Sequence, residues 1–124
     1  MAVLGVNHIA FRTRDPNALR AFYAELTGAE ELSGTHGPPL RVGDTLLVFF
    51  ETEADPVGTS DPDEIAFDVD RSGFDDVLTA ARRLGCLARE PVEHTRWSRG
   101  FLVRDPDGRR IEFVHDDHSV YWSE

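Results

Sequence analysis

Lysine is absent from the 124-residue chain, and all 13 basic side chains are arginine. Schiff-base catalysis requires a lysine amine, so that chemistry is excluded. The chain also carries 23 acidic side chains, which gives a formal net charge of −10. Because so acidic a chain repels phosphate backbones and anionic lipid headgroups, we expect neither a nucleic acid nor a membrane as its partner.

Cysteine is scarce as well. The single Cys86 cannot form an internal disulfide, and one thiolate cannot build a zinc cage. A metal site in this chain would therefore consist of histidine and carboxylate ligands. A chain of this length buries about two thirds of its unfolded surface, which is enough for one domain with a stable core.

Long apolar runs are also missing. The longest covers residues 46–50, far short of the ~20 residues that a membrane-spanning helix needs. No basic segment precedes Val3 and Leu4. We therefore expect no signal peptide and a cytoplasmic protein.

A short motif occurs twice in the chain. Residues 7–11 (Asn-His-Ile-Ala-Phe) return as residues 63–67 (Asp-Glu-Ile-Ala-Phe), and a helical pattern follows each copy. This internal repeat predicts two similar modules. We place them at residues 1–51 and 63–124, with the tail included in the second. Residues 52–62, rich in Asp, Pro, Gly and Ser, form the linker.

Each module contains one amphipathic helix pattern. In the first module, Asp15 followed by Pro16 predicts a helix start, and Gly28 predicts its end. In the second module, either Asp70 or Ser72 can cap the helix. Gly85 predicts the end of that helix. The apolar positions with helical spacing are Leu19, Phe22, Tyr23 and Leu26 in the first module, and Phe74, Val77, Leu78 and Ala81 in the second.

Short β-prone runs separated by turn residues follow each helix. We predict strands near residues 30–33, 40–42 and 45–51 in the first module, and near residues 87–93, 100–104 and 109–115 in the second. Residues 105–108 (Asp-Pro-Asp-Gly) predict a tight turn. The chain therefore reads as an α+β protein built from two tandem βαβββ modules.

Strand alternation sorts the side chains of the predicted sheets onto two faces. Ile9 with Phe11, Ile65 with Phe67 and Val69, and Ile111 with Phe113 belong to the face that packs on the helices. The opposite face receives His8 with Ala10, Glu64 with Ala66, and Glu112 with Val114. Three groups suited to metal binding or acid–base chemistry therefore lie away from the helices.

Two motifs together resemble the vicinal oxygen chelate superfamily. One runs from residues 7–11 through Asp15-Pro16 and Ala21-Phe22-Tyr23 to Gly28, and the other covers residues 104–113 (Arg-Asp-Pro-Asp-Gly-Arg-Arg-Ile-Glu-Phe). The superfamily includes glyoxalase I, bleomycin-resistance proteins, extradiol dioxygenases, methylmalonyl-CoA epimerase and fosfomycin thiol transferases. The resemblance covers nearly the whole chain. It implies a cup-shaped mixed sheet with helices on its outer face, and a divalent ion on its floor that binds two neighbouring substrate oxygens.

The resemblance also implies a ligand set. Its metal positions fall on His8, Glu64 and Glu112, whereas the fourth ligand of glyoxalase I and the epimerase would fall on Leu47 or Val48, neither of which binds metal. Glutamate stands where the dioxygenases and thiol transferases usually carry histidine. One imidazole and two carboxylates suit Mn²⁺, Mg²⁺, Fe²⁺, Zn²⁺ or Ni²⁺, but they differ from the two-histidine, one-carboxylate triad of iron oxygenases.

Two classes of function follow from the resemblance. The first is a metal-dependent lyase or isomerase that acts on a small oxygenated metabolite by Lewis-acid catalysis, with Glu64 or Glu112 as a general base. Extradiol dioxygenase activity ranks lower because of the ligand change. The second class is a metal-free protein of the bleomycin-resistance kind, which sequesters a small molecule. In that case His8 is a hydrogen-bonded pocket histidine and both glutamates face solvent.

Further residues are candidates for substrate contacts. Val48 and Phe50 provide an apolar lining. His94, Trp97 and Arg99 lie in or beside a loop where members of the family often contact substrate; there an arginine can hold a carboxylate or phosphate and a tryptophan can stack on a ring. The alternative is a solvated turn with one packed aromatic ring. Small members of the family are usually dimers, so we expect a homodimer by analogy.

Overall fold

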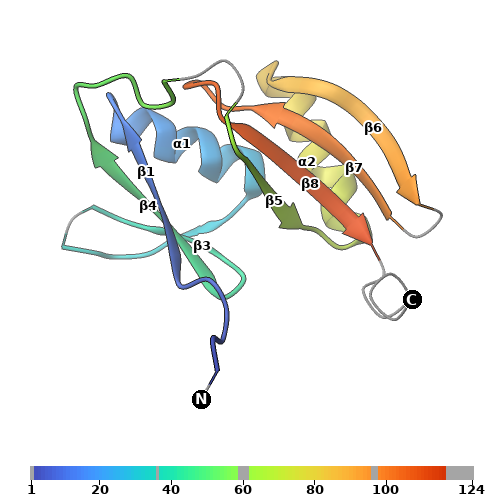
Figure 1. The fold of residues 1–124 in the computed structure, drawn as a ribbon, viewed down its shortest axis with the longest axis horizontal. Helices are drawn as coiled ribbons and strands as arrows, with labels where there is room; N and C mark the ends of the chain where they lie inside the picture. The colour runs from blue at the N-terminus through green and yellow to red at the C-terminus, as the bar shows by residue number, and fades with distance from the viewer. Residues whose placement is uncertain (1, 36, 59–61, 96–97, 117–124) are drawn as a thin grey trace. The chain divides into compact units, whose positions relative to one another are not determined.

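The computed structural model describes residues 2–35, 37–58, 62–95 and 98–116 (Figure 1). The chain divides into two compact units, Met1–Pro56 and Val57–Glu124. The division falls inside the segment 52–62. Neither helix of the described residues has the length and apolar character needed to span a membrane.

The first unit is a four-stranded mixed sheet with one helix against it. Its elements are β1 (His8–Thr13), α1 (Pro16–Thr27), β2 (Glu30–Glu31), β3 (Leu40–Val42) and β4 (Thr45–Glu51). The strand order is β1-β4-β3-β2, and β1 runs parallel to β4 while the other pairs are antiparallel.

The second unit repeats this arrangement. Its elements are β5 (Glu64–Asp68), α2 (Arg71–Leu84), β6 (Leu87–Thr95), β7 (Ser98–Arg104) and β8 (Arg110–Asp116). The strand order is β5-β8-β7-β6, with β5 parallel to β8. The predicted α+β class and the two βαβββ modules are therefore confirmed.

Side-chain caps and left-handed glycines set the ends of both helices. The Asp15 carboxylate accepts a hydrogen bond from Ala18 N–H at 3.0 Å, and Gly28, with φ of 69°, ends α1. At α2 the cap is Asp70 rather than Ser72: its carboxylate accepts from Gly73 N–H at 2.7 Å. The Ser72 hydroxyl donates to the same oxygen at 3.2 Å, so both residues contribute to one cap.

Aromatic rings form the centre of each unit's core. In the first unit, the Phe11 ring stacks on Tyr23 with centroids 5.1 Å apart. In the second, Phe101 lies edge-on to Phe74 at 5.0 Å and beside Phe113 at 5.5 Å. These residues are buried. The helix stripes depart from the prediction at four positions: Phe22 and Leu78 are only half-buried, whereas Arg20 and Ala80, which were not expected, are buried.

The strand predicted at residues 30–33 is shorter in the structure, because β2 covers only Glu30–Glu31. Leu32 N–H still donates to the Pro39 carbonyl at 2.8 Å. Pro38 and Pro39 have no N–H, so they cannot continue the ladder in the other direction. The buried Arg20 holds the loop instead: its Nε donates to the Pro38 carbonyl at 2.7 Å.

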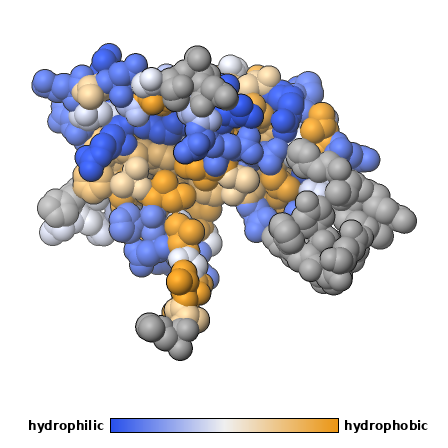
Figure 2. Space-filling model, in the orientation of Figure 1, coloured by the Kyte–Doolittle hydropathy of each residue, from blue (hydrophilic) through white to orange (hydrophobic). Residues whose placement is uncertain are grey.

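The N-terminal segment before β1 exposes apolar side chains. Val3 and Leu4 are each 96 % exposed, and Figure 2 shows the segment as hydrophobic surface. The Thr45 hydroxyl donates to the Val6 carbonyl at 2.9 Å. This bond attaches the end of the segment to the start of β4.

Candidate functional site

We use "open face" for the sheet face opposite the helix in each unit. In the first unit, β1 pairs with β4 so that His8 lies opposite Leu46, Ala10 opposite Val48 and Arg12 opposite Phe50. The intervening residues, including Phe11, Leu47 and Phe49, are buried under α1. The six paired residues therefore share the open face, as strand alternation predicts.

His8 is exposed at the start of β1, and its Nδ1 lies 2.8 Å from Oδ1 of Asn7. An amide oxygen only accepts hydrogen bonds, so this contact favours the proton on Nδ1, and in that tautomer of the neutral ring Nε2 has the lone pair. Metal-binding histidines are commonly oriented in this way, with the second ring nitrogen donating to an oxygen.

Apolar side chains continue the open face along β4 from the position opposite this histidine. Val48 is half-buried and Phe50 is exposed, with the Arg12 guanidinium 5.9 Å from the centroid of the Phe50 ring. Leu47, one of the two positions for a fourth ligand, is buried on the helix side instead. The open face of the first unit therefore offers one imidazole and an apolar surface beside it.

On the open face of the second unit lie the two candidate carboxylates. Glu64 on β5 pairs with Arg110 on β8, and Ala66 pairs with Glu112. The alternate residues Phe67 and Phe113 are buried against α2. Both glutamates therefore point away from the helix, and they come from neighbouring strands.

Each of these carboxylates has an arginine partner. Oε2 of Glu112 lies 2.9 Å from Nη2 of Arg89, and the Glu112 side chain is only 12 % exposed. Oε1 of Glu64 lies 3.3 Å from Nη2 of Arg110, and its side chain is 36 % exposed. The sequence-based prediction missed both arginines. Strand alternation could have identified Arg110, since it stands two residues before Glu112 on the same strand.

The donor types fit a hard divalent ion, because they combine an imidazole nitrogen with carboxylate oxygens. His8 belongs to the first unit, and Glu64 and Glu112 belong to the second. Within neither unit do the described residues gather three His, Cys, Asp or Glu side chains around a point where an ion could bind. An ion at either glutamate would share its carboxylate with a guanidinium.

The remaining predicted contact residues lie elsewhere or outside the described residues. The Arg99 guanidinium sits 4.1 Å from the centroid of the Phe74 ring and 3.9 Å from the Asp75 carboxylate. Both partners belong to α2, so Arg99 lies on the helix side of the sheet. The backbone of His94 lies in β6, but its side chain is outside what the structure describes, and so is the whole of Trp97.

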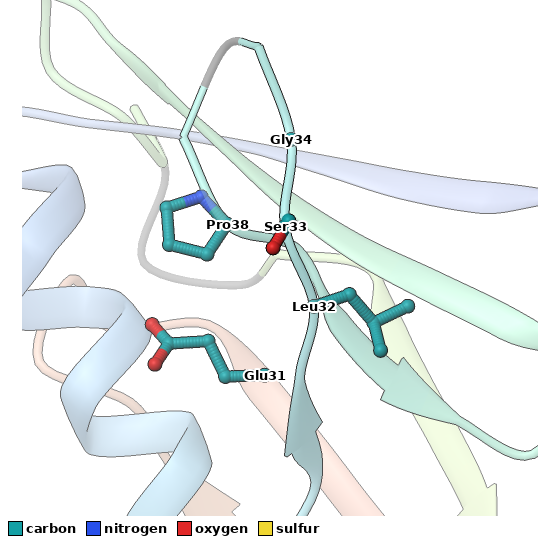
Figure 3. A pocket seen from close by; sticks show the side chains of 5 residues that line it. All are labelled: Glu31, Leu32, Ser33, Gly34 and Pro38. Atoms are coloured by element: carbon teal, nitrogen blue, oxygen red, sulfur yellow. The ribbon is translucent and has the colours of Figure 1, made fainter.

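A cavity of about 390 Å³ lies in the first unit, beside the loop that Arg20 holds (Figure 3). None of the predicted site residues lines it. The lining residues are Glu31, Leu32, Ser33, Gly34 and Pro38. The cavity is open to solvent, and Glu31 is the one charged residue in its lining, so we assign it no catalytic or binding role.

Cys86 follows α2, and its Sγ lies 3.7 Å from the Ala81 carbonyl. Burial raises the pKa of the Cys86 thiol above its ordinary value. The thiolate is the reactive form of cysteine, so this shift makes Cys86 a poorer nucleophile.

The chain belongs to the Glyoxalase/Bleomycin resistance protein/Dioxygenase superfamily, whose family model matches residues 5–113. Members of this superfamily bind small-molecule substrates and commonly use divalent metal ions. Comparison with curated protein sequences finds no match.

Several solved structures share the fold. Oxidase ChaP-H2 is 22 % identical over 94 % of this chain and 96 % of its own, with a TM-score of 0.78. The fosfomycin resistance protein FosX from Mesorhizobium loti is 21 % identical over 95 % and 97 %, with a TM-score of 0.76. Lactoylglutathione lyase from Agrobacterium tumefaciens is 21 % identical over 92 % and 95 %, with a TM-score of 0.69. Likeness at these identities concerns the fold alone.

Proposed function

We propose that the chain is a divalent-metal-dependent lyase or isomerase of a small oxygenated metabolite, with His8, Glu64 and Glu112 as the metal ligands. One observation carries the proposal: the strand registers place all three side chains on open faces, opposite the helices. The contact of His8 Nδ1 with Asn7 suits a histidine that binds an ion through Nε2. The ion, when bound, supplies a Lewis acid for neighbouring substrate oxygens.

The two carboxylates take different roles in this proposal. Glu112 is more covered and is held by Arg89, which fixes the direction of its oxygens. Glu64 is more exposed, so it can reach a substrate proton beside a carbonyl and act as general base. Val48 and Phe50 exclude water from the apolar part of the substrate, and His94 and Trp97 remain predicted contacts. Arg99 does not, because it lies on the helix side.

A second candidate is a metal-free binding protein of the bleomycin-resistance type. The contacts of Glu112 with Arg89 and of Glu64 with Arg110 favour it, because a guanidinium already compensates each carboxylate. An extradiol-type dioxygenase is less well supported, since the ligand set lacks a second histidine. For either candidate we propose a homodimer, by analogy with small members of the family.

Metal analysis separates the two candidates. We would purify the full chain without chelator or affinity tag and measure its content of Mn, Mg, Fe, Zn and Ni. The metal-dependent proposal expects a stoichiometric divalent ion that is lost in His8→Ala. His115→Ala is the matched control, because His115 Nδ1 lies 3.0 Å from the Val69 carbonyl and belongs to no proposed site. A protein that neither retains nor takes up a divalent ion supports the binding protein.

A further inference from the structure

We propose that the open face of the second unit binds the carboxylate of a small organic acid through Arg89 and Arg104, with Arg110 beside them. This inference rests on the proposed small-molecule function and specifies the class of its ligand. It does not depend on a metal ion, so the two proposals can fail separately.

Strand register places these three arginines on one face. β7 and β8 are antiparallel, and Arg104 lies directly opposite Arg110, while Leu102 lies opposite Glu112. Arg89 on β6 lies opposite Leu102. The alternate positions, including Phe101, Val103, Ile111 and Phe113, are buried against α2. The arginines therefore gather on the side of the sheet that the helix leaves open.

Arg104 and Arg110 form a cross-strand pair of like charges. Like charges directly opposite each other destabilise an antiparallel pair. Arg110 donates to Glu64, but the Nη1 of Arg104 donates to the neutral carbonyl of Gly108 at 2.9 Å. Within the described part of the chain, Arg104 makes no ion pair. An added carboxylate between the strands would relieve the repulsion.

Arg89 has capacity for a second acceptor. A guanidinium carries five N–H donors, and the Nη2 of Arg89 serves Glu112. Its Nε is covered, yet it has no hydrogen-bond partner among the residues that the structure describes. The side chain as a whole remains 38 % exposed. The covered Nε is closed to a ligand, so a carboxylate would bind through the N–H groups of Nη1 and Nη2 that Glu112 does not use, and Glu112 would stay in place.

The next row of the same face selects the rest of the ligand. Val92, Gly100 and Val114 pair across β6, β7 and β8, and Val92 is 42 % exposed. Beyond Val114, this row ends at Asp68 on β5. An apolar surface beside the arginines suits a hydrocarbon body, and Asp68 disfavours a second negative charge. The ligand class is therefore a monocarboxylate with an apolar body.

Benzoate and benzamide test this assignment, because they share a shape and differ in charge. We would titrate each into the full chain at low ionic strength and follow binding by calorimetry and NMR. Benzoate is expected to bind at least about tenfold more tightly than benzamide, since benzamide cannot form the charge-assisted bonds. Benzoate is expected to bind His8→Ala as it binds the wild type, which separates recognition by arginine from ligation by a metal.

Variants locate the site. Arg89→Met and Arg104→Met are each expected to weaken benzoate by about tenfold, and Arg89→Lys should restore only part of the affinity because it lacks the fork. Arg82→Met is the matched control, since Arg82 pairs with Glu90 at 2.7 Å on exposed side chains outside the open face. Arg89→Met removes the partner of the Glu112 carboxylate and could therefore fail to fold. In that case the double variant Arg89→Met/Glu112→Gln is used, because it removes both charges.

Three results would overturn the assignment: no binding of benzoate at millimolar concentration, equal binding of benzoate and benzamide, or wild-type affinity in both the Arg104→Met and the Arg89→Met/Glu112→Gln proteins. Metal content measured on the same samples keeps the two proposals apart. A wild-type protein that holds a divalent ion but does not bind benzoate refutes the carboxylate site alone. A wild-type protein that binds benzoate but holds no divalent ion refutes the metal-dependent function alone.

Discussion

The guanidinium of Arg89 lies 2.9 Å from the carboxylate of Glu112, although β7 separates their two strands. The pair spans Leu102, which is buried in the row between them. This charged pair on the open face therefore covers an apolar side chain and fixes the orientation of Glu112, a candidate metal ligand. This relationship links the stability of the second unit to its chemistry.

Removal of Arg89 should therefore destabilise the protein. Arg89→Met leaves the mostly covered Glu112 carboxylate without this partner, and we expect the free energy of unfolding to fall by about 1–3 kcal/mol. Urea unfolding measures the change. The exposed pair of Arg82 and Glu90 provides the control, because Arg82→Met should change stability by less than about 1 kcal/mol. Equal effects of the two variants would show that the Arg89 pair is an ordinary surface contact.

Gly37 is expected to tolerate no side chain. Its φ is +93°, and a Cβ there would lie 2.9 Å from Nη2 of Arg20, the side chain that holds the loop. Gly37→Ala should cost about 1–3 kcal/mol, from backbone strain together with displacement of Arg20. Gly43→Ala isolates the strain, because Gly43 has φ of +58° and open space around its Cβ position. If thermal unfolding gives the two variants the same loss, Arg20 does not restrict this position.

Asp70 should make α2 sensitive to acid. The Gly73 N–H, and after it the Ser72 hydroxyl, hold the pKa of the Asp70 carboxyl below its ordinary value. A lowered pKa in the folded state gives a stabilisation that is complete above the ordinary carboxyl pKa of about 3.9 and is lost as the pH falls through the folded value. Asp70→Asn keeps an oxygen at the cap but does not titrate. The stability difference between wild type and variant should therefore shrink below that pH, and a constant difference would contradict the assignment.

Two phenylalanines should separate stability from binding. Phe101 is fully buried between Phe74 and Phe113, so Phe101→Ala should cost about 3–5 kcal/mol. Phe50 is exposed on the open face of the first unit. Phe50→Ala should change stability by less than about 1 kcal/mol and weaken the binding of a small apolar ligand. Unfolding and ligand titration of both variants check this, and a large loss of stability in Phe50→Ala would place Phe50 in the core.

Local signals in the sequence were sufficient for most of the fold. The Asp15 cap with Pro16, and the glycines at positions 28 and 85, mark helix ends because they act on their own backbone neighbours. Strand alternation places Glu64 and Glu112 on one face because β5 and β8 pair without irregularity. The helix ends need no knowledge of distant residues, whereas the shared face of Glu64 and Glu112 also depends on the predicted repeat and its strand pairing.

The features that sequence patterns missed depend on distant contacts. β6 contains register shifts on both sides of Arg89, so simple alternation does not show which face the side chain joins. Arg20 occupies a buried position on α1 because its guanidinium meets a carbonyl 18 residues away. No helical hydrophobic pattern predicts a buried arginine. The positions of both arginines therefore could be found only in the folded structure.

The stoichiometry of divalent metal bound by the full chain tests the central claim most directly. Titration calorimetry with Mn²⁺ should give one ion per wild-type chain, and this binding should disappear in His8→Ala and in Glu112→Gln. Absence of Mn²⁺ binding by the wild type, or the same binding in both variants, would contradict the assignment of His8, Glu64 and Glu112 as metal ligands.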